Sequence, residues 1–254
     1  MINAQKLLEQ FLAGQAGGLL EKGLGAALGG GRGGAAGSGL GGLAGGVIAS
    51  SLISMLLGSK GGRRLASRAL TYGGLAALGG LALKAYRDWQ ASQQAPASGT
   101  SAGSSASSQP TSLEAAVRSA EGTAFLPSSA DERARNELSL SILRAMISAA
   151  KADGHVDADE LQRIFGHLDS ASLSAEEKAF IIDELRKPLD IAEVVAGVRS
   201  REQAVEIYAA SLLAIDPDQP SEKAYLDELA RRLSLDPALV DHINREIAAS
   251  TERA

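Results

Sequence analysis

The uneven distribution of glycine is the feature that most constrains the fold of this chain, because 23 of the 29 glycines lie between Gly14 and Gly80. Glycine costs backbone entropy inside a helix or strand, so this stretch and the rest of the chain build different kinds of structure. Charge divides the chain at nearly the same place. Residues 1–90 carry a net charge of +6, and the remainder carries −11. The sequence therefore predicts a basic, apolar front part and an acidic, folded back part.

Residues 35–58 form the longest apolar stretch without a charge. Their length is about what a helix needs to cross the hydrocarbon core of a bilayer. Gly37, Gly41 and Gly45 recur at every fourth position, so a helix here would present a groove of small residues to a neighbouring helix. The pattern favours a membrane span and predicts a homo-oligomer held together through the glycine-rich helices.

A second uncharged stretch covers residues 69–83 and is short for a full span. Tyr72, Tyr86 and Trp89 lie near its ends, as residues at a membrane interface do. We therefore expect a glycine-rich N-terminal region at residues 1–34 and a membrane-associated segment of one or two helices at residues 35–90. The alternatives are a soluble glycine-rich segment or one that lies on the membrane surface. Basic residues flank both stretches, so the positive-inside rule does not choose an orientation.

Residues 91–111 are rich in Ser, Ala and Gly, and they predict a flexible, disordered linker that lets the following domain move independently. From residue 112 to residue 250 the apolar residues recur with a helical period of about 3.6. Helix start signals precede several of these segments: Asp157, Ser174, Ser200, Ser221 and Asp236-Pro237. We expect an all-α fold with a C-terminal bundle of about seven helices at residues 112–250.

Two acidic loops within this domain are the candidate functional site. Asp153, Asp157 and Glu160 lie in the first loop, and Asp216 and Glu222 lie in the second. Hard divalent cations prefer oxygen ligands, so these residues are candidate Ca²⁺ or Mg²⁺ ligands. Neither loop fits an EF-hand, and helix capping explains some of the carboxylates equally well.

Several classes of function find no support in the sequence. The chain has no cysteine and three histidines, which makes a structural zinc site a poor match. No serine lies in a nucleophile elbow, and the glycine-rich stretch lacks the strand and the Lys-Ser/Thr ending of a phosphate-binding loop. The folded part is acidic, so nucleic acid is not an expected partner. We expect a protein that is not an enzyme.

The run AMISAAKADGHVDADELQRI, with YAASLLAIDPDQPSEKAYLDELARRLSL after it, resembles the TerB-like helical domain of tellurite-resistance proteins. The order of apolar segment, polar linker and helical domain is similar to that of the YebE-type bacterial inner-membrane proteins. This resemblance implies paired helical units, a location in the inner membrane, and acidic residues that bind a metal. By position, these are Asp153, Asp157 and Glu160, and in the second unit Asp216 and Glu222.

Two functional hypotheses follow. In the first, the protein is a membrane-anchored TerB-like module that binds a divalent cation through its acidic loops and acts in an envelope or stress response. In the second, it is a metal-free helical scaffold of the inner membrane that binds a protein partner. The sequence does not identify that partner.

Overall fold

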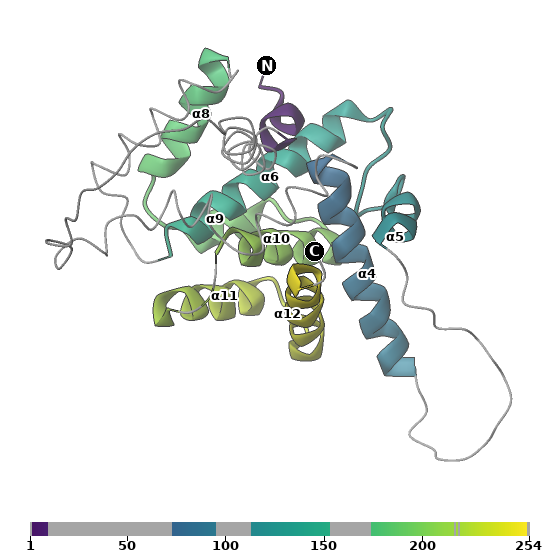
Figure 1. Cartoon of the computed structure of the whole chain (residues 1–254). Coiled ribbons are helices and arrows are strands. Elements are labelled where there is room, and N and C mark those ends of the chain that lie inside the picture. Colours follow the sequence, from purple (N-terminus) through teal and green to yellow (C-terminus); the bar gives the residue numbers. More distant parts are fainter. Residues whose placement is uncertain are drawn as a thin grey trace, which may run out of the picture.

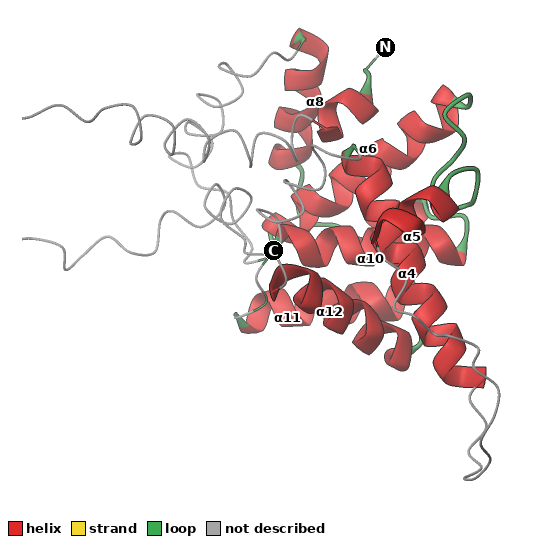
Figure 2. Cartoon of the chain, turned by 45° about the vertical axis from the view of Figure 1, so that its right-hand side comes forward, coloured by secondary structure: helices red, strands yellow, loops and turns green. Residues whose placement is uncertain are grey.

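The computed structural model describes residues 2–9, 73–94, 113–152, 174–215, 217 and 219–252. Within these ranges the fold is all-α, as expected, and it contains no strand (Figures 1 and 2). The labelled helices are α4 (Gly74–Gln94), α5 (Leu113–Ala120), α6 (Glu132–Ala150), α8 (Ala175–Arg186), α9 (Ile191–Ala196), α10 (Arg201–Ala214), α11 (Pro220–Arg232) and α12 (Pro237–Glu252). Residues 4–9 form a further short helix at the N-terminus.

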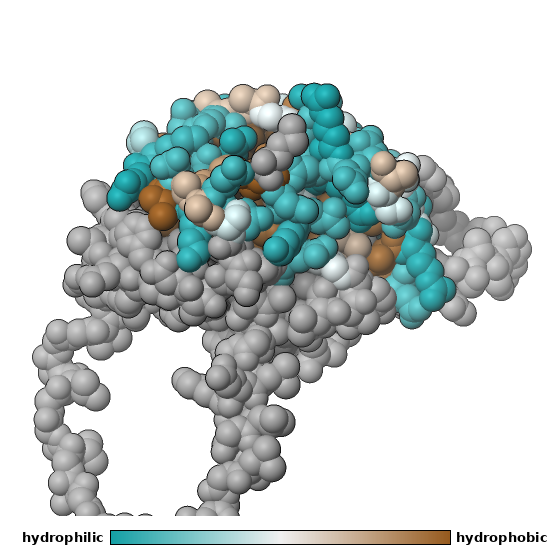
Figure 3. All heavy atoms as spheres, turned by 90° about the horizontal axis from the view of Figure 1, so that it is seen from above, coloured by the Kyte–Doolittle hydropathy of each residue, from teal (hydrophilic) through white to brown (hydrophobic). Residues whose placement is uncertain are grey.

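Helix α10 is the centre of the domain (Figure 1). Every residue from Ala204 to Ala214 is buried, and the helix packs against α4, α6, α11 and α12. A helix that is apolar on all sides is stable only when other elements surround it. Side chains on the face in Figure 3 are mostly hydrophilic, and Leu189 is the one exposed large hydrophobic residue among those that the structure describes.

The predicted helix starts are largely confirmed. The hydroxyl of Ser174 accepts a hydrogen bond from the Glu177 backbone N–H, and the Glu177 carboxylate accepts one from Ser174, which completes a capping box for α8. Ser200 and Asp236 cap α10 and α12 in the same local way. These signals operate within three or four residues, so the sequence alone was enough to find them. Asp157 lies outside the described residues.

The start of helix α11 lies two residues before the predicted start signal. Its N-cap is Gln219 instead of Ser221, and Pro220 occupies the first helical position. Proline suits that position because its missing N–H would have no partner within the helix. The carboxylate of Glu222 then reaches back and accepts a hydrogen bond from the Gln219 backbone N–H at 3.3 Å.

Helix α4 contains most of the second apolar stretch, and it lies in the core of the helical domain. Leu75, Leu78 and Leu81 are each at most 2% exposed, and α4 packs against α5, α10 and α12. Close approach is possible because Gly79 and Gly80 have no side chain: a Cβ at Gly80 would lie 2.5 Å from Cγ2 of Val117 in α5. The part of the expected membrane segment that the structure describes is therefore a core helix. None of the described helices is long and apolar enough to cross a membrane.

The packing of α4 bears on the expectation that the linker separates two independent parts of the chain. Helices α4 and α5 lie on either side of it in the chain and pack against each other. Lys84 of α4 also forms an ion pair with Glu246 of α12 at 2.7 Å. The expected independence of the two parts does not extend to α4, because α4 is held by helices from both ends of the domain. The folded core therefore includes α4 as well as the helices that follow residue 112.

The N-terminal residues join the same core. Ala4, Leu7 and Leu8 are each at most 1% exposed. The backbone N–H of Ala4 donates a hydrogen bond to Oδ1 of Asn136 in α6 at 2.6 Å, which fixes this short helix on the domain. The core therefore contains residues from before the glycine-rich part and, through α4, residues from its end.

Candidate functional site

The predicted metal ligands are mostly outside what the structure describes. This is the case for Asp153, Asp157, Glu160 and Asp216. Glu222 is described, and it is fully buried in the first turn of α11 as the capping residue of that helix. Among the described residues, no group of three or more His, Asp or Glu side chains is arranged to hold a metal ion. Glu222 thus caps α11, and its part in metal binding stays a prediction.

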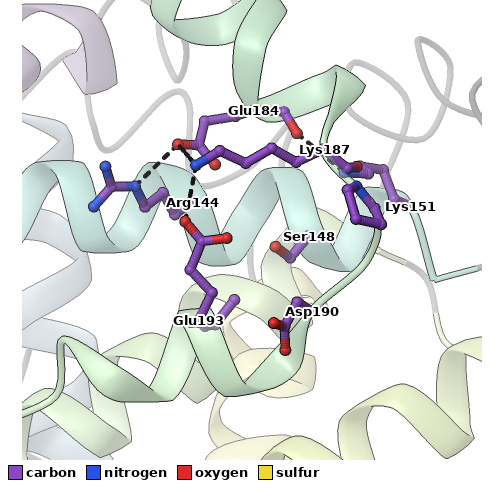
Figure 4. A pocket seen from close by; sticks show the side chains of 9 residues that line it. Arg144, Ser148, Lys151, Glu184, Lys187, Asp190 and Glu193 are labelled. Atoms are coloured by element: carbon purple, nitrogen blue, oxygen red, sulfur yellow. Dashed lines mark hydrogen bonds and ion pairs between the residues drawn. The ribbon is translucent and has the colours of Figure 1, made fainter.

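A polar pocket lies between the end of α6, the end of α8 and the start of α9 (Figure 4). Its cavity volume is about 10 Å³, which is room for about one water molecule. Its walls carry three basic and three acidic side chains with Ser148, Pro188 and Val194; the charged residues are Arg144, Lys151, Glu184, Lys187, Asp190 and Glu193. The charges balance, so the pocket does not select for an anion or a cation by net charge.

Lys151 forms the buried end of this pocket. It follows α6 directly, and the whole residue is only 6% exposed. Its Nζ donates hydrogen bonds to the backbone carbonyl of Glu184, at 3.0 Å, and to that of Lys187. These carbonyls belong to the C-terminal end of α8, where the helix dipole favours a positive charge. Burial lowers the pKa of Lys151, although the nearby carboxylates of Glu184 and Glu193 oppose this shift.

An ion-pair network covers the outer part of the pocket. The Glu184 carboxylate accepts hydrogen bonds from Nε of Arg144 at 3.1 Å and from Nζ of Lys187 at 2.9 Å. Lys187 also donates to Glu193 of α9 at 2.8 Å. Hydrogen bonds to Glu193 and then to Glu184 raise the pKa of Lys187. The network joins α6, α8 and α9.

The polar groups of this pocket mainly hold α6, α8 and α9 together. Asp190 is already engaged, because its side chain accepts the backbone N–H of Ala192 and caps α9. Lys151 donates to two carbonyls, and the Glu184 carboxylate has two cationic partners. Groups held in this way are poor candidates for proton transfer to a substrate. They can present hydrogen-bonding groups to a polar part of another molecule.

A second notable group, Glu206, lies deep in the core. It is fully buried in α10, and neither carboxylate oxygen has a hydrogen-bond partner among the described residues. Burial alone raises its pKa well above the ordinary value. A Cβ added at Gly79 of α4 would lie 3.2 Å from its Oε1, which places the carboxyl group beside α4.

Sequence reasoning missed both features, for different reasons. Lys151 lies within the quoted AAKADG run, but nothing in the sequence shows that the end of α8 folds over it. Glu206 had a usable signal: it interrupts the run AVEIYAASLLA, whose apolar residues occur on all sides of a helix. A helix of that kind is buried all round, and so a carboxyl group within it is buried too.

Comparison with known proteins matches most of the chain to one family. The model of a family described as "Protein of unknown function (DUF533)" matches residues 38–247. A relative from Yersinia enterocolitica, described as "Uncharacterized protein in ampR 5'region", is 27% identical over 106 residues, which cover 42% of this chain and 76% of the relative. No solved structure matches. The family match includes α4 as well as the later helices, in agreement with their packing.

Proposed function

The chain belongs to the DUF533 family of proteins of unknown function, and we propose that it is a non-enzymatic helical module, tethered to the bacterial inner membrane, that binds a protein partner. The tether in this proposal is the uncharged apolar stretch at residues 35–58. A helix there satisfies its backbone hydrogen bonds internally, which a bilayer requires. The resemblance to TerB-like domains and to YebE-type inner-membrane proteins supports the same assignment.

One observation carries the proposal: the helical domain holds both chain segments that flank the apolar stretch. Residues 2–9 precede it and α4 follows it, and both lie in the core of the domain. A bilayer-inserted stretch between them would attach the folded domain directly to the membrane at two points. This arrangement suits a module that holds a partner at a fixed distance from the membrane.

The pocket supports binding in preference to catalysis. Its titratable groups are used to join α6, α8 and α9. The partly exposed charged side chains at its edge, Arg144, Lys187 and Glu193, suit contact with a partner that carries polar or charged groups. These contacts support the scaffold hypothesis.

Cation binding at the first acidic loop stays a prediction. Thermal unfolding of the whole chain with EDTA and then with Mg²⁺ or Ca²⁺ measures it, because a ligand that binds only the native state raises the melting temperature by mass action. If these carboxylates are helix caps, no cation shifts the melting temperature. A shift that Asp153→Asn removes and Ser174→Ala keeps would restore the metal-binding hypothesis.

Alkaline carbonate extraction of membranes tests the tether. We expect the intact chain to stay in the membrane pellet. Val47→Arg places a charge at the middle of the apolar stretch, at a cost of about 2.5–3.5 kcal/mol for insertion, and we expect it to shift the chain toward the supernatant. The matched control is Ser105→Arg in the linker, which adds the same charge outside the stretch. Release of the unaltered chain by carbonate would refute the tether.

A further inference from the structure

The carboxyl group of Glu206 is buried at the contact between α10 and α4. The residue is 0% exposed, and neither carboxylate oxygen has a hydrogen-bond partner among the described residues. A Cβ added at Gly79 of α4 would lie 3.2 Å from Oε1 of Glu206 and 2.6 Å from the backbone oxygen of Phe125. The carboxyl group therefore faces the backbone of α4, beside the loop that holds Phe125.

The charged side chains of the helices packed on α10 are engaged elsewhere. Those that are partly or fully buried are Lys84 and Asp88 of α4, Arg135 and Arg144 of α6, Glu222 and Glu228 of α11, and His242 and Glu246 of α12. Each of them is bonded to or paired with a group other than Glu206. Burial alone raises the pKa of Glu206, so none of these groups sets its charge.

A charge on Glu206 would need water or a cation beside it, because an unpaired charge in an apolar core is very unfavourable. Helix α10 is held in place by α4, α6, α11 and α12 together. Helix α4 lies between α5 and α10 at one side of the domain (Figure 1), and its backbone is what the carboxyl group faces. Movement of α4 is therefore the shortest route by which water can reach the carboxyl group.

We propose that the proton on Glu206 keeps α4 packed on α10, and that loss of this proton as the pH rises releases α4 from the rest of the domain. The packing is fully stabilised at low pH, and each pH unit above the pKa of the packed state weakens it about tenfold. Release uncovers the sides of α10 and α12 on which α4 packs, and so opens an apolar surface to a partner. This device works whether or not residues 35–58 lie in a membrane.

Trp89 reports the position of α4, because it lies in α4 and is the only tryptophan of the chain. It is 7% exposed, and the guanidinium carbon of Arg201 in α10 lies 4.7 Å from the centroid of its ring. A tryptophan that becomes exposed to water emits at longer wavelength and is quenched more readily by acrylamide. The buried tyrosines Tyr208 and Tyr225 stay neutral in the range of the test, because burial raises the pKa of both, that of Tyr208 to about 12.

The test follows Trp89 emission and acrylamide quenching of the purified whole chain from about pH 5 to about pH 9, a range in which buried carboxyl groups titrate. Circular dichroism at the helical band is recorded on the same samples. Glu206→Gln keeps the shape of the protonated carboxyl group but cannot ionise. Glu202→Gln is the matched control, since it makes the same change one turn earlier on α10, at a carboxylate that is only partly buried.

We expect the ratio of exposed to buried Trp89 to rise with pH in the natural chain and in Glu202→Gln, approaching about tenfold per pH unit, while most of the helical signal remains. In Glu206→Gln we expect a constant ratio.

A Trp89 signal that does not change up to about pH 9 in the natural chain would overturn the proposal, as would an equal pH response in Glu206→Gln. Loss of the whole helical signal together with the change at Trp89 would also overturn it, because the domain would then unfold instead of releasing α4. If Glu206→Gln does not fold, the first and third of these results, measured on the natural chain, still decide.

Discussion

Replacing Gly79 with alanine tests the position of α4 in the core. The added Cβ would lie 2.6 Å from the backbone carbonyl oxygen of Phe125 and 3.2 Å from Oε1 of Glu206. Real Cβ atoms do not approach a carbonyl oxygen so closely, and a backbone atom cannot rotate away as a flexible side chain can. Helix α4 must therefore move away from the loop that holds Phe125.

The size of the effect follows from two opposing contributions. Alanine is favoured over glycine inside a helix by about 1 kcal/mol. Overpacking a well-packed site costs about 1–3 kcal/mol. Because the contact is with backbone, we take the upper part of that range and expect a net loss of about 1–2 kcal/mol. For a chain of this size each kcal/mol lowers the melting temperature by about 2–4 °C, which gives a decrease of about 2–8 °C.

The assay is thermal unfolding of the purified whole chain, followed by circular dichroism at the helical band. Gly197→Ala is the matched control, since a Cβ at Gly197 would lie at an ordinary 3.6 Å from Oγ of Ser141 and its backbone is right-handed helical. We expect the control to change the melting temperature by less than about 1 °C. A melting temperature for Gly79→Ala equal to or above that of the natural chain would refute the packing of α4 against Phe125.

Two further predictions concern buried ionisable groups. Burial raises the pKa of Glu206 above its ordinary value of 4.5, so the contribution of this group to stability is full below that pH and is lost as the pH rises toward the pKa of the folded state. The denaturant midpoint of Glu206→Gln should therefore fall less than that of the natural chain between about pH 5 and pH 8, and parallel curves would contradict this. Lys151→Met removes the donor to two carbonyls at the end of α8, and we expect a loss of about 1–3 kcal/mol in urea unfolding. An unchanged urea midpoint would show that those carbonyls do not depend on Lys151.

Local signals made much of the fold predictable from the sequence. Ser174, Ser200 and Asp236 mark helix starts through bonds to residues two or three positions away, and the structure confirms each of them. The N-cap of α11 is Gln219 instead of Ser221, because Gln219 forms a capping box with Glu222 and Pro220 suits the first helical position.

The role of α4 could not be read from the sequence, because an uncharged stretch of about fifteen residues is compatible with a membrane or with a protein core. Only the partner surfaces distinguish these environments, and they come from α5, α10 and α12, which lie far away in the chain. The burial of Lys151 was not predictable for the same reason, because the end of α8 that covers it lies far away in the chain. Of the predicted ligands, Glu222 is a buried cap, and the other four lie outside the described residues.

Residues 2–9, α4 and the helices that follow residue 112 pack as one folded unit. Thermal unfolding of residues 73–254 beside residues 113–254 tests it most directly, since the two fragments differ by α4 and the linker, and both lack residues 1–72. We predict that the longer fragment unfolds cooperatively and that the shorter one unfolds at least about 10 °C lower or without a cooperative transition, because the faces of α5, α10 and α12 that α4 covers become exposed. Equal melting temperatures for the two fragments would contradict the account.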